Sequence, residues 1–195
     1  MIALRFSKIV AGISLACLCT SAHALGGCAS DAAPWLTLKI TAGALSPEAD
    51  RTTVVRIHAD GCADVHRPAY LREAGDFRVA LAANEVAALR TKIDSAGLRH
   101  FDAPQVRAKL GSLQKEHAEQ RKVSGSEYFT VSDADSYEME WADAKSRGSV
   151  VWAGLPSYAE AYPEVTALRD LNRMAEALQT VAQRSDAVRV QGATP

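Results

Sequence analysis

Residues 52 to 67, TTVVRIHADGCADVHR, can bury one side of a β-hairpin in only one register. Apolar and polar residues alternate on both sides of a central Asp-Gly, a dipeptide that favours tight turns. A two-residue loop would place Ile57 opposite Asp64 and mix apolar with charged groups on each face. A three-residue loop, 59–61, sorts them, because a shift of one residue turns every side chain to the opposite face. We therefore expect four cross-strand pairs: Val55 with Val65, Ile57 with Ala63, Arg56 with Asp64, and His58 with Cys62.

Further segments alternate with the period of a strand, namely 35–41, 76–81 and 148–154. Residues 128–143 predict a second hairpin, since the same register test selects a loop at 133–135. In that hairpin Val131 would face Tyr137, and Phe129 would face Met139.

Helical spacing of apolar residues marks three more segments. They are 84–96, which ends before Gly97, a segment after Pro104 that is polar at its end, and 164–184, the most amphipathic of the three. The predicted fold class is α+β: a mainly antiparallel sheet of about seven strands, two hairpins plus single strands, packed against two or three helices. The order hairpin, strand, helix would then occur twice as a pseudo-repeat, offset by 73 positions between Asp60 and Asp133.

The first 24 residues have the layout of a secretory signal peptide. Arg5 and Lys8 precede the apolar run 9–19, and the small residues Ala22 and Ala24 form a cleavage motif. We expect a single domain over 25–184 and a flexible tail over 185–195, which has little apolar content to bury. No segment of the mature chain has the length and apolarity of a transmembrane span.

Two cysteines remain after removal of the signal peptide, Cys28 and Cys62. In an oxidising compartment such a pair usually forms a disulfide. A second interpretation stays open, because LGGC at 25–28 also resembles a lipobox, in which Cys28 would carry a lipid anchor. Lipidation would exclude the disulfide and leave Cys62 as an unpaired thiol.

Charge and motifs exclude several classes of function. Loss of Arg5 and Lys8 leaves 20 basic against 23 acidic side chains, so there is no basic surplus for binding nucleic acid. His58, Cys62, Asp64 and His66 share one face, but strand residues four apart lie roughly 13 Å apart, too far for one zinc ion. No cofactor motif and no nucleophile motif occurs in the mature chain, and we expect no cofactor.

The hairpin, the segment GDFRVAL, the helix NEVAALRTKIDSAGL and the final amphipathic helix resemble small exported α+β domains of unknown function from Gram-negative bacteria. The resemblance covers residues 50–182 and concerns the layout, so it identifies no catalytic or binding position. It implies a periplasmic or secreted protein, or a lipoprotein.

Three hypotheses are consistent with this pattern. The first is a non-catalytic domain that contacts another envelope protein through a solvated face bearing Arg56, His58, Asp64 and His66. The second is a hydrolase or small-ligand-binding protein whose site is assembled from distant residues. The third is a structural component anchored by lipid at Cys28.

Overall fold

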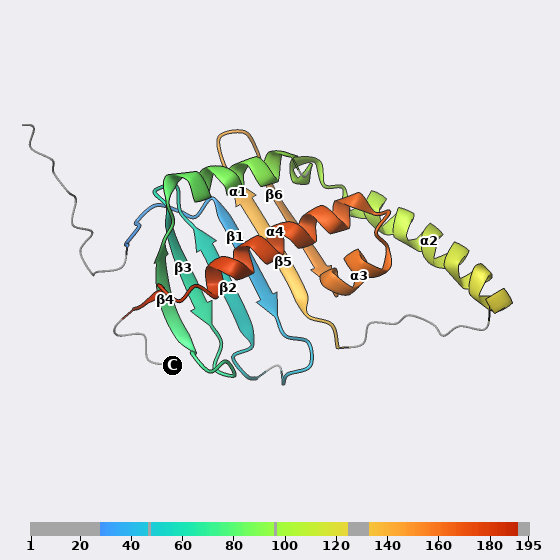
Figure 1. The fold of residues 1–195 in the computed structure, drawn as a ribbon, viewed down its shortest axis with the longest axis horizontal. Helices are drawn as coiled ribbons and strands as arrows, with labels where there is room; N and C mark the ends of the chain where they lie inside the picture. The colour runs from blue at the N-terminus through green and yellow to red at the C-terminus, as the bar shows by residue number, and fades with distance from the viewer. Residues whose placement is uncertain (1–27, 47, 96, 125–132, 191–195) are drawn as a thin grey trace, which may run out of the picture.

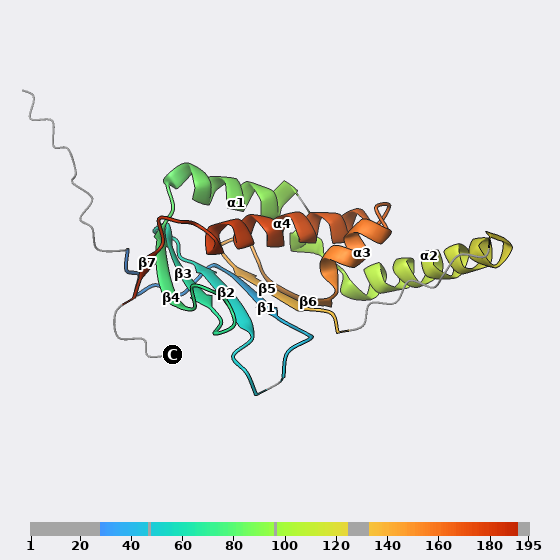
Figure 2. The same cartoon turned by 60° about the horizontal axis from the view of Figure 1, so that its bottom comes forward.

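The computed structural model describes residues 28–46, 48–95, 97–124 and 133–190, and of residues 121–124 it describes the backbone alone. It confirms the α+β class: a seven-stranded antiparallel sheet carries its helices on one face (Figures 1 and 2). The strands lie in the order β6-β5-β1-β2-β3-β4-β7. Their bounds are β1 Leu36–Thr41, β2 Thr52–Ile57, β3 Cys62–Arg67, β4 Gly75–Ala80, β5 Ser136–Ala142, β6 Arg147–Ala153 and β7 Val188–Arg189.

The hairpin of β2 and β3 has the predicted register. Val55 pairs with Val65, Ile57 with Ala63 and Arg56 with Asp64. The His58 N–H donates to the Cys62 carbonyl at 2.8 Å, which closes the three-residue loop. Gly61 has φ of 88°, a left-handed conformation in which a residue without Cβ is unstrained.

The second hairpin lies elsewhere than predicted. Both edges of β5 are occupied: Tyr137 pairs with Ile40 of β1 and with Trp152 of β6. The prediction that β5 pairs with the segment of Val131 and Phe129 is therefore wrong. These two residues themselves lie outside the described part of the chain. The true hairpin is β5–β6, which turns through residues 143–146. In the predicted pseudo-repeat, Asp133 belongs to the loop of the second hairpin. In the structure Asp133 precedes β5 and does not join it to a neighbouring strand, so the second half of the repeat lacks the predicted hairpin.

Helices α1 (Ala83–Ser95) and α4 (Thr166–Ala182) cover one face of the sheet (Figure 1). Their apolar stripes lie where the spacing predicts them, with Leu89 and Ile93 buried in α1 and Leu168, Leu171 and Leu178 buried in α4. The short 3₁₀ helix η1 (Leu98–His100) follows Gly97. No helix of the described residues is long and apolar enough to span a membrane.

Two further helices are present among the described residues. One is α3 (Leu155–Ala161), which is not among the three helical segments predicted from the sequence, and the other is the helix predicted after Pro104, which is confirmed. Helix α2 (Ala103–Ser124) extends well past the sheet in both views (Figures 1 and 2). Its first turns contact the body, where Arg107 lies over the Trp152 ring at 5.2 Å and Lys109 donates to the Glu164 carbonyl at 3.0 Å.

The segment after α4 is also more ordered than the expected tail. β7 pairs with β4, and the guanidinium of Arg189 lies over the Phe77 ring at 4.9 Å. Arg184 joins Glu85 of α1 at 2.8 Å and Asp186 at 2.6 Å. Cation–π and ion-pair contacts thus hold residues 184–190, which contain few apolar groups, against the sheet edge.

Candidate functional site

The face of the sheet opposite the helices is polar and carries the predicted site residues. We call it the helix-free face; the charged side chains on it are Lys39, Arg56, Asp64, His66, Asp76, Arg78, Glu138, Glu140 and Arg147. Antiparallel sheets commonly bury one face and solvate the other, and this sheet follows that rule.

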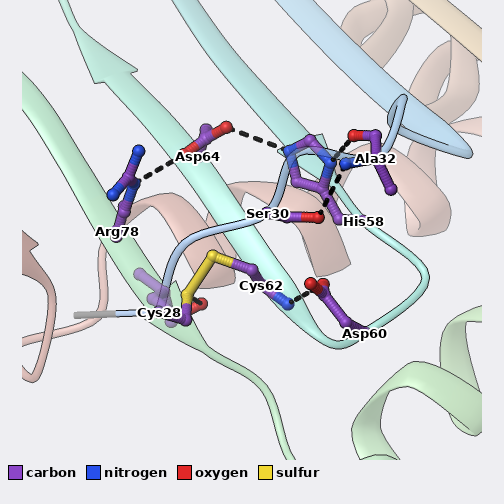
Figure 3. Close-up of a disulfide and its surroundings, with 9 residues drawn as sticks. Cys28, Ser30, Ala32, His58, Asp60, Cys62, Asp64 and Arg78 are labelled. Atoms are coloured by element: carbon purple, nitrogen blue, oxygen red, sulfur yellow. Dashed lines mark hydrogen bonds and ion pairs between the residues drawn. A yellow bond between two sulfur atoms is a disulfide. The ribbon is translucent and has the colours of Figure 1, made fainter.

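A disulfide fixes the N-terminal segment at one end of this face (Figure 3). Cys28 and Cys62 are bonded, with 5.5 Å between their Cα atoms. Since Cys62 begins β3, the bond places residues 28–34 beside the end of the β2–β3 hairpin. The Ser30 hydroxyl reaches Asp60 in the hairpin loop, and the Cys62 N–H donates to the same carboxylate at 2.9 Å. These two hydrogen bonds, the backbone one first, hold the pKa of Asp60 below its usual value.

The N-terminal segment covers His58, whose predicted exposure is wrong. The residue is only 4% exposed. Its Nδ1 lies 2.6 Å from the Ala32 carbonyl and its Nε2 lies 2.9 Å from Asp64 (Figure 3). A buried ring with both nitrogens engaged is poorly placed to take a proton from a substrate.

The Asp64 side chain contacts two neighbouring side chains, and Arg56 is not one of them. Its carboxylate contacts His58 and the Nε of Arg78, the latter at 3.3 Å. Arg78 stands directly opposite Asp64 on β4. The predicted register of Arg56 with Asp64 is confirmed, but the two side chains form no ion pair. Arg56 is exposed and has no ion pair with any residue in the described ranges.

His66 lies between two carboxylates at the opposite end of β3. Its Nδ1 is 2.7 Å from Asp76 of β4, and its Nε2 is 3.1 Å from Asp50, which precedes β2. Burial alone would lower the pKa of His66, but the hydrogen bonds and charges of Asp76 and Asp50 outweigh it, so the pKa is raised above 6.5. Asp50 also accepts the Ala69 N–H at 3.1 Å. His66 is therefore part of a clamp that joins β3, β4 and the loops beside them.

These residues form no metal site. The Cys62 sulfur is bonded to Cys28 in the disulfide. His58 contacts Asp64, whereas His66 contacts Asp76. Across the described residues, no group of three or more His, Cys, Asp or Glu side chains could hold one ion.

A second charged cluster, which the sequence interpretation missed, lies at the β5–β6 turn. Arg99 of η1 contacts Asp94 and Asp143, with Nη2 2.6 Å from Asp143, and donates to the Ser146 hydroxyl at 2.6 Å. The Arg99 guanidinium, with the backbone N–H groups of Lys145 and Ser146, holds the pKa of Asp143 well below its usual range. The side chains of Arg99 and Asp143 are 12% and 8% exposed. This cluster joins the end of α1 to the sheet.

The sequence matches no known family model, and no curated protein shows significant sequence similarity to it. Function must therefore be inferred from the chain's own surfaces and cavities.

Other residues of the site were missed by the sequence interpretation for different reasons. Asp76 and Arg78 alternate in GDFRVAL, so pairing that segment with β3 would have placed them beside His66 and Asp64. No sequence signal indicated Asp50, because it reaches His66 from a loop of irregular structure.

Proposed function

We propose that this chain is exported and acts as a non-catalytic binding domain of the cell envelope, contacting another envelope protein through the helix-free face. The observation that carries the proposal is that Arg56 is exposed and has no ion pair within the described ranges. It belongs to β2, the middle strand of the seven, and its expected partner Asp64 is engaged by His58 and Arg78. An exposed guanidinium at the centre of a face is suited to a carboxylate of a partner, which it binds with two parallel hydrogen bonds.

The surroundings of Arg56 are already ordered, which favours binding. Lys39 contacts Glu138 at 3.2 Å, across the β1–β5 pair. Asp64 with Arg78, and His66 with Asp76, bridge β3 to β4. Side chains held in this way lose less conformational entropy when a partner docks.

Two features support export, and one of them, the disulfide, also argues against a lipid anchor. The first 24 residues have the order of a signal peptide, and the disulfide is typical of an oxidising compartment. A lipoprotein would acylate the Cys28 sulfur, and in this fold that sulfur is bonded to Cys62.

The hydrolase alternative receives less support from the site. Catalysis by a histidine requires a ring nitrogen that can exchange a proton with a substrate. His58 and His66 each have both nitrogens within hydrogen-bond distance of protein oxygens.

Position-specific photo-crosslinking in the intact cell tests the proposal. A photoreactive amino acid replaces Arg56 in one strain and Arg173 in another; the Arg173 side chain, on α4, is 65% exposed. We expect one discrete protein adduct from position 56 and none from position 173, and the Arg56→Glu chain should no longer compete for that adduct.

Two results would contradict the proposal. One is an absence of adducts from position 56, and the other is equal labelling of the same proteins from both positions. Cytoplasmic retention of the full-length precursor would contradict export separately, so failure of the binding surface and of the compartment can be told apart.

A further inference from the structure

A cavity of about 460 Å³ opens at one end of the helix-bearing face. It lies where the sheet reaches beyond the last turn of α4; in Figure 1 the lower ends of β2, β3 and β4 pass that helix. Its walls come from four distant parts of the chain: the ends of β1 and β2, the β3–β4 loop, the residue before β5, and α4. The lining residues used below are Ile40, Arg67, Tyr70, Leu71, Arg72 and Ala182.

The mouth of the cavity is apolar. Tyr70 and Leu71 are adjacent on the β3–β4 loop and are 50% and 39% exposed. They account for two of the four large apolar side chains that are exposed among the described residues. Exposed apolar groups beside a concavity mark sites of ligand binding more often than isolated ones do. The buried side chains of Ile40 and Ala182 continue this apolar surface inward.

The loop that carries the mouth is held in place. The Leu71 N–H donates to the Pro68 carbonyl at 3.0 Å, and Asp50 accepts the Ala69 N–H. Arg67, at the base of the loop, donates to the Ala182 and Arg184 carbonyls at 2.9 and 3.1 Å. The concavity is therefore preformed, as small-ligand sites usually are.

Two arginines and two acidic residues line the cavity, and Arg72 supplies an unpaired positive charge at its rim. Of the two acidic residues, Glu73 contacts Arg67 at 2.8 Å, whereas Asp135 accepts the Gly43 N–H at 3.1 Å and has no ion pair within the described ranges. Arg72 is exposed and has no ion pair or side-chain hydrogen bond within the described ranges. An apolar cavity with a free guanidinium at its rim matches a ligand with an apolar body and an anionic end.

We infer that this cavity binds a small amphiphilic anion, with the apolar body between Tyr70, Leu71 and Ile40 and the anionic group against Arg72. A volume of 460 Å³ holds about fifteen water-sized groups at about 30 Å³ each, so a straight-chain carboxylate of eight carbons fits. The site is separate from the helix-free face, which lies on the other side of the sheet.

The test is a titration of the mature protein with octanoate, followed by backbone amide chemical shifts. Octanamide serves as the uncharged probe of the same size, and vesicles of phosphatidylglycerol represent an anionic membrane surface. We expect octanoate to shift the amides of residues 69–73 and 179–183 selectively. Leu71→Asp and Arg72→Glu should each weaken octanoate binding at least tenfold, whereas Arg56→Glu on the helix-free face should leave it unchanged.

Each result of the titration has a distinct meaning. Octanamide binding as tightly as octanoate would overturn the assignment of an anionic ligand. Absence of selective shifts with octanoate, in a protein whose spectrum shows it to be folded, would overturn the site itself. Binding to the vesicles without binding to octanoate would replace the small ligand by a membrane surface. Because the crosslinking experiment concerns Arg56, its outcome is independent of these results.

Discussion

The Nε–H of Arg67 donates to the carbonyl oxygen of Ala182 at 2.9 Å, joining the end of β3 to the last residue of α4 across 115 positions of sequence. The same guanidinium donates to the Arg184 carbonyl and lies over the Phe77 ring at 4.2 Å. The last carbonyls of a helix have no partner within the helix, and they carry a partial negative charge. Arg67 therefore satisfies the end of α4 while it occupies the base of the cavity.

Replacement of Arg67 by methionine should lower the free energy of unfolding by about 2–4 kcal/mol, because the buried Ala182 carbonyl and the partly buried Arg184 carbonyl lose a charged donor. Urea unfolding measures the loss. Arg173→Met, on the exposed side of α4, is the matched control and should change stability by less than about 0.5 kcal/mol. Equal effects of the two substitutions would show that Arg67 contributes no more than a surface residue.

The His66 clamp predicts a pH dependence of stability. The folded-state pKa of His66 is raised above 6.5, so its contribution is fully present below pH 6.5 and is lost as the pH rises through the raised value. Wild type should therefore lose more stability than His66→Gln between pH 6 and pH 9, as measured by urea unfolding.

An NMR titration of the His66 ring provides the independent check. Its midpoint should lie above 6.5 in wild type and should fall in Asp76→Asn, because the substitution removes one of the two neighbouring charges. A wild-type midpoint below 6.5 would contradict the clamp.

Local patterns predicted most of the elements but not all of the pairings. The register of β2 with β3 can be predicted from residues that are close in sequence, since a shift of one residue would expose Val55 and Val65. The partner of β5 does not follow in this way. Met139 pairs with Leu38, about a hundred positions earlier, and a single sequence contains no signal for so distant a contact. The prediction assigned β5 to the nearest alternating segment instead.

The burial of His58 could not be predicted for a related reason. Its position on the polar side of β2 was predicted correctly, but its cover comes from residues near Ala32 that belong to no strand or helix. The predicted disulfide already placed Cys28 beside Cys62, next to His58 in the hairpin. Whether the chain between Cys28 and β1 would cross that side of the sheet depends on its irregular path, which has no sequence period.

The disulfide should be a large single contribution to stability. It joins residues 34 positions apart, and a crosslink of that span stabilises by about 3–4 kcal/mol on the chain-entropy estimate. We expect reductant to lower the urea midpoint of wild type and to leave that of Cys28→Ala/Cys62→Ala unchanged.

The intact mass of the exported protein tests the same bond in the native compartment. It should correspond to a chain that begins at Leu25 and lacks two hydrogens. A mass increased by acyl groups would show that Cys28 is lipidated, and the disulfide would then be absent.

Two glycines should respond in opposite directions to replacement by alanine. At Gly148 of β6 the new methyl group would overlap the six-membered ring of Trp141, lying 2.6 Å from its Cε2 atom. Overpacking of this kind usually costs about 1–3 kcal/mol. At Gly111 of α2 nothing lies within 4 Å of the new methyl group, and alanine favours the helix by about 1 kcal/mol.

Thermal or urea unfolding of both variants measures the two changes. Stabilisation by Gly148→Ala would show that the Trp141 ring is free to move from its position across the β5–β6 hairpin, and an unchanged Gly111→Ala protein would show that α2 does not unfold together with the sheet.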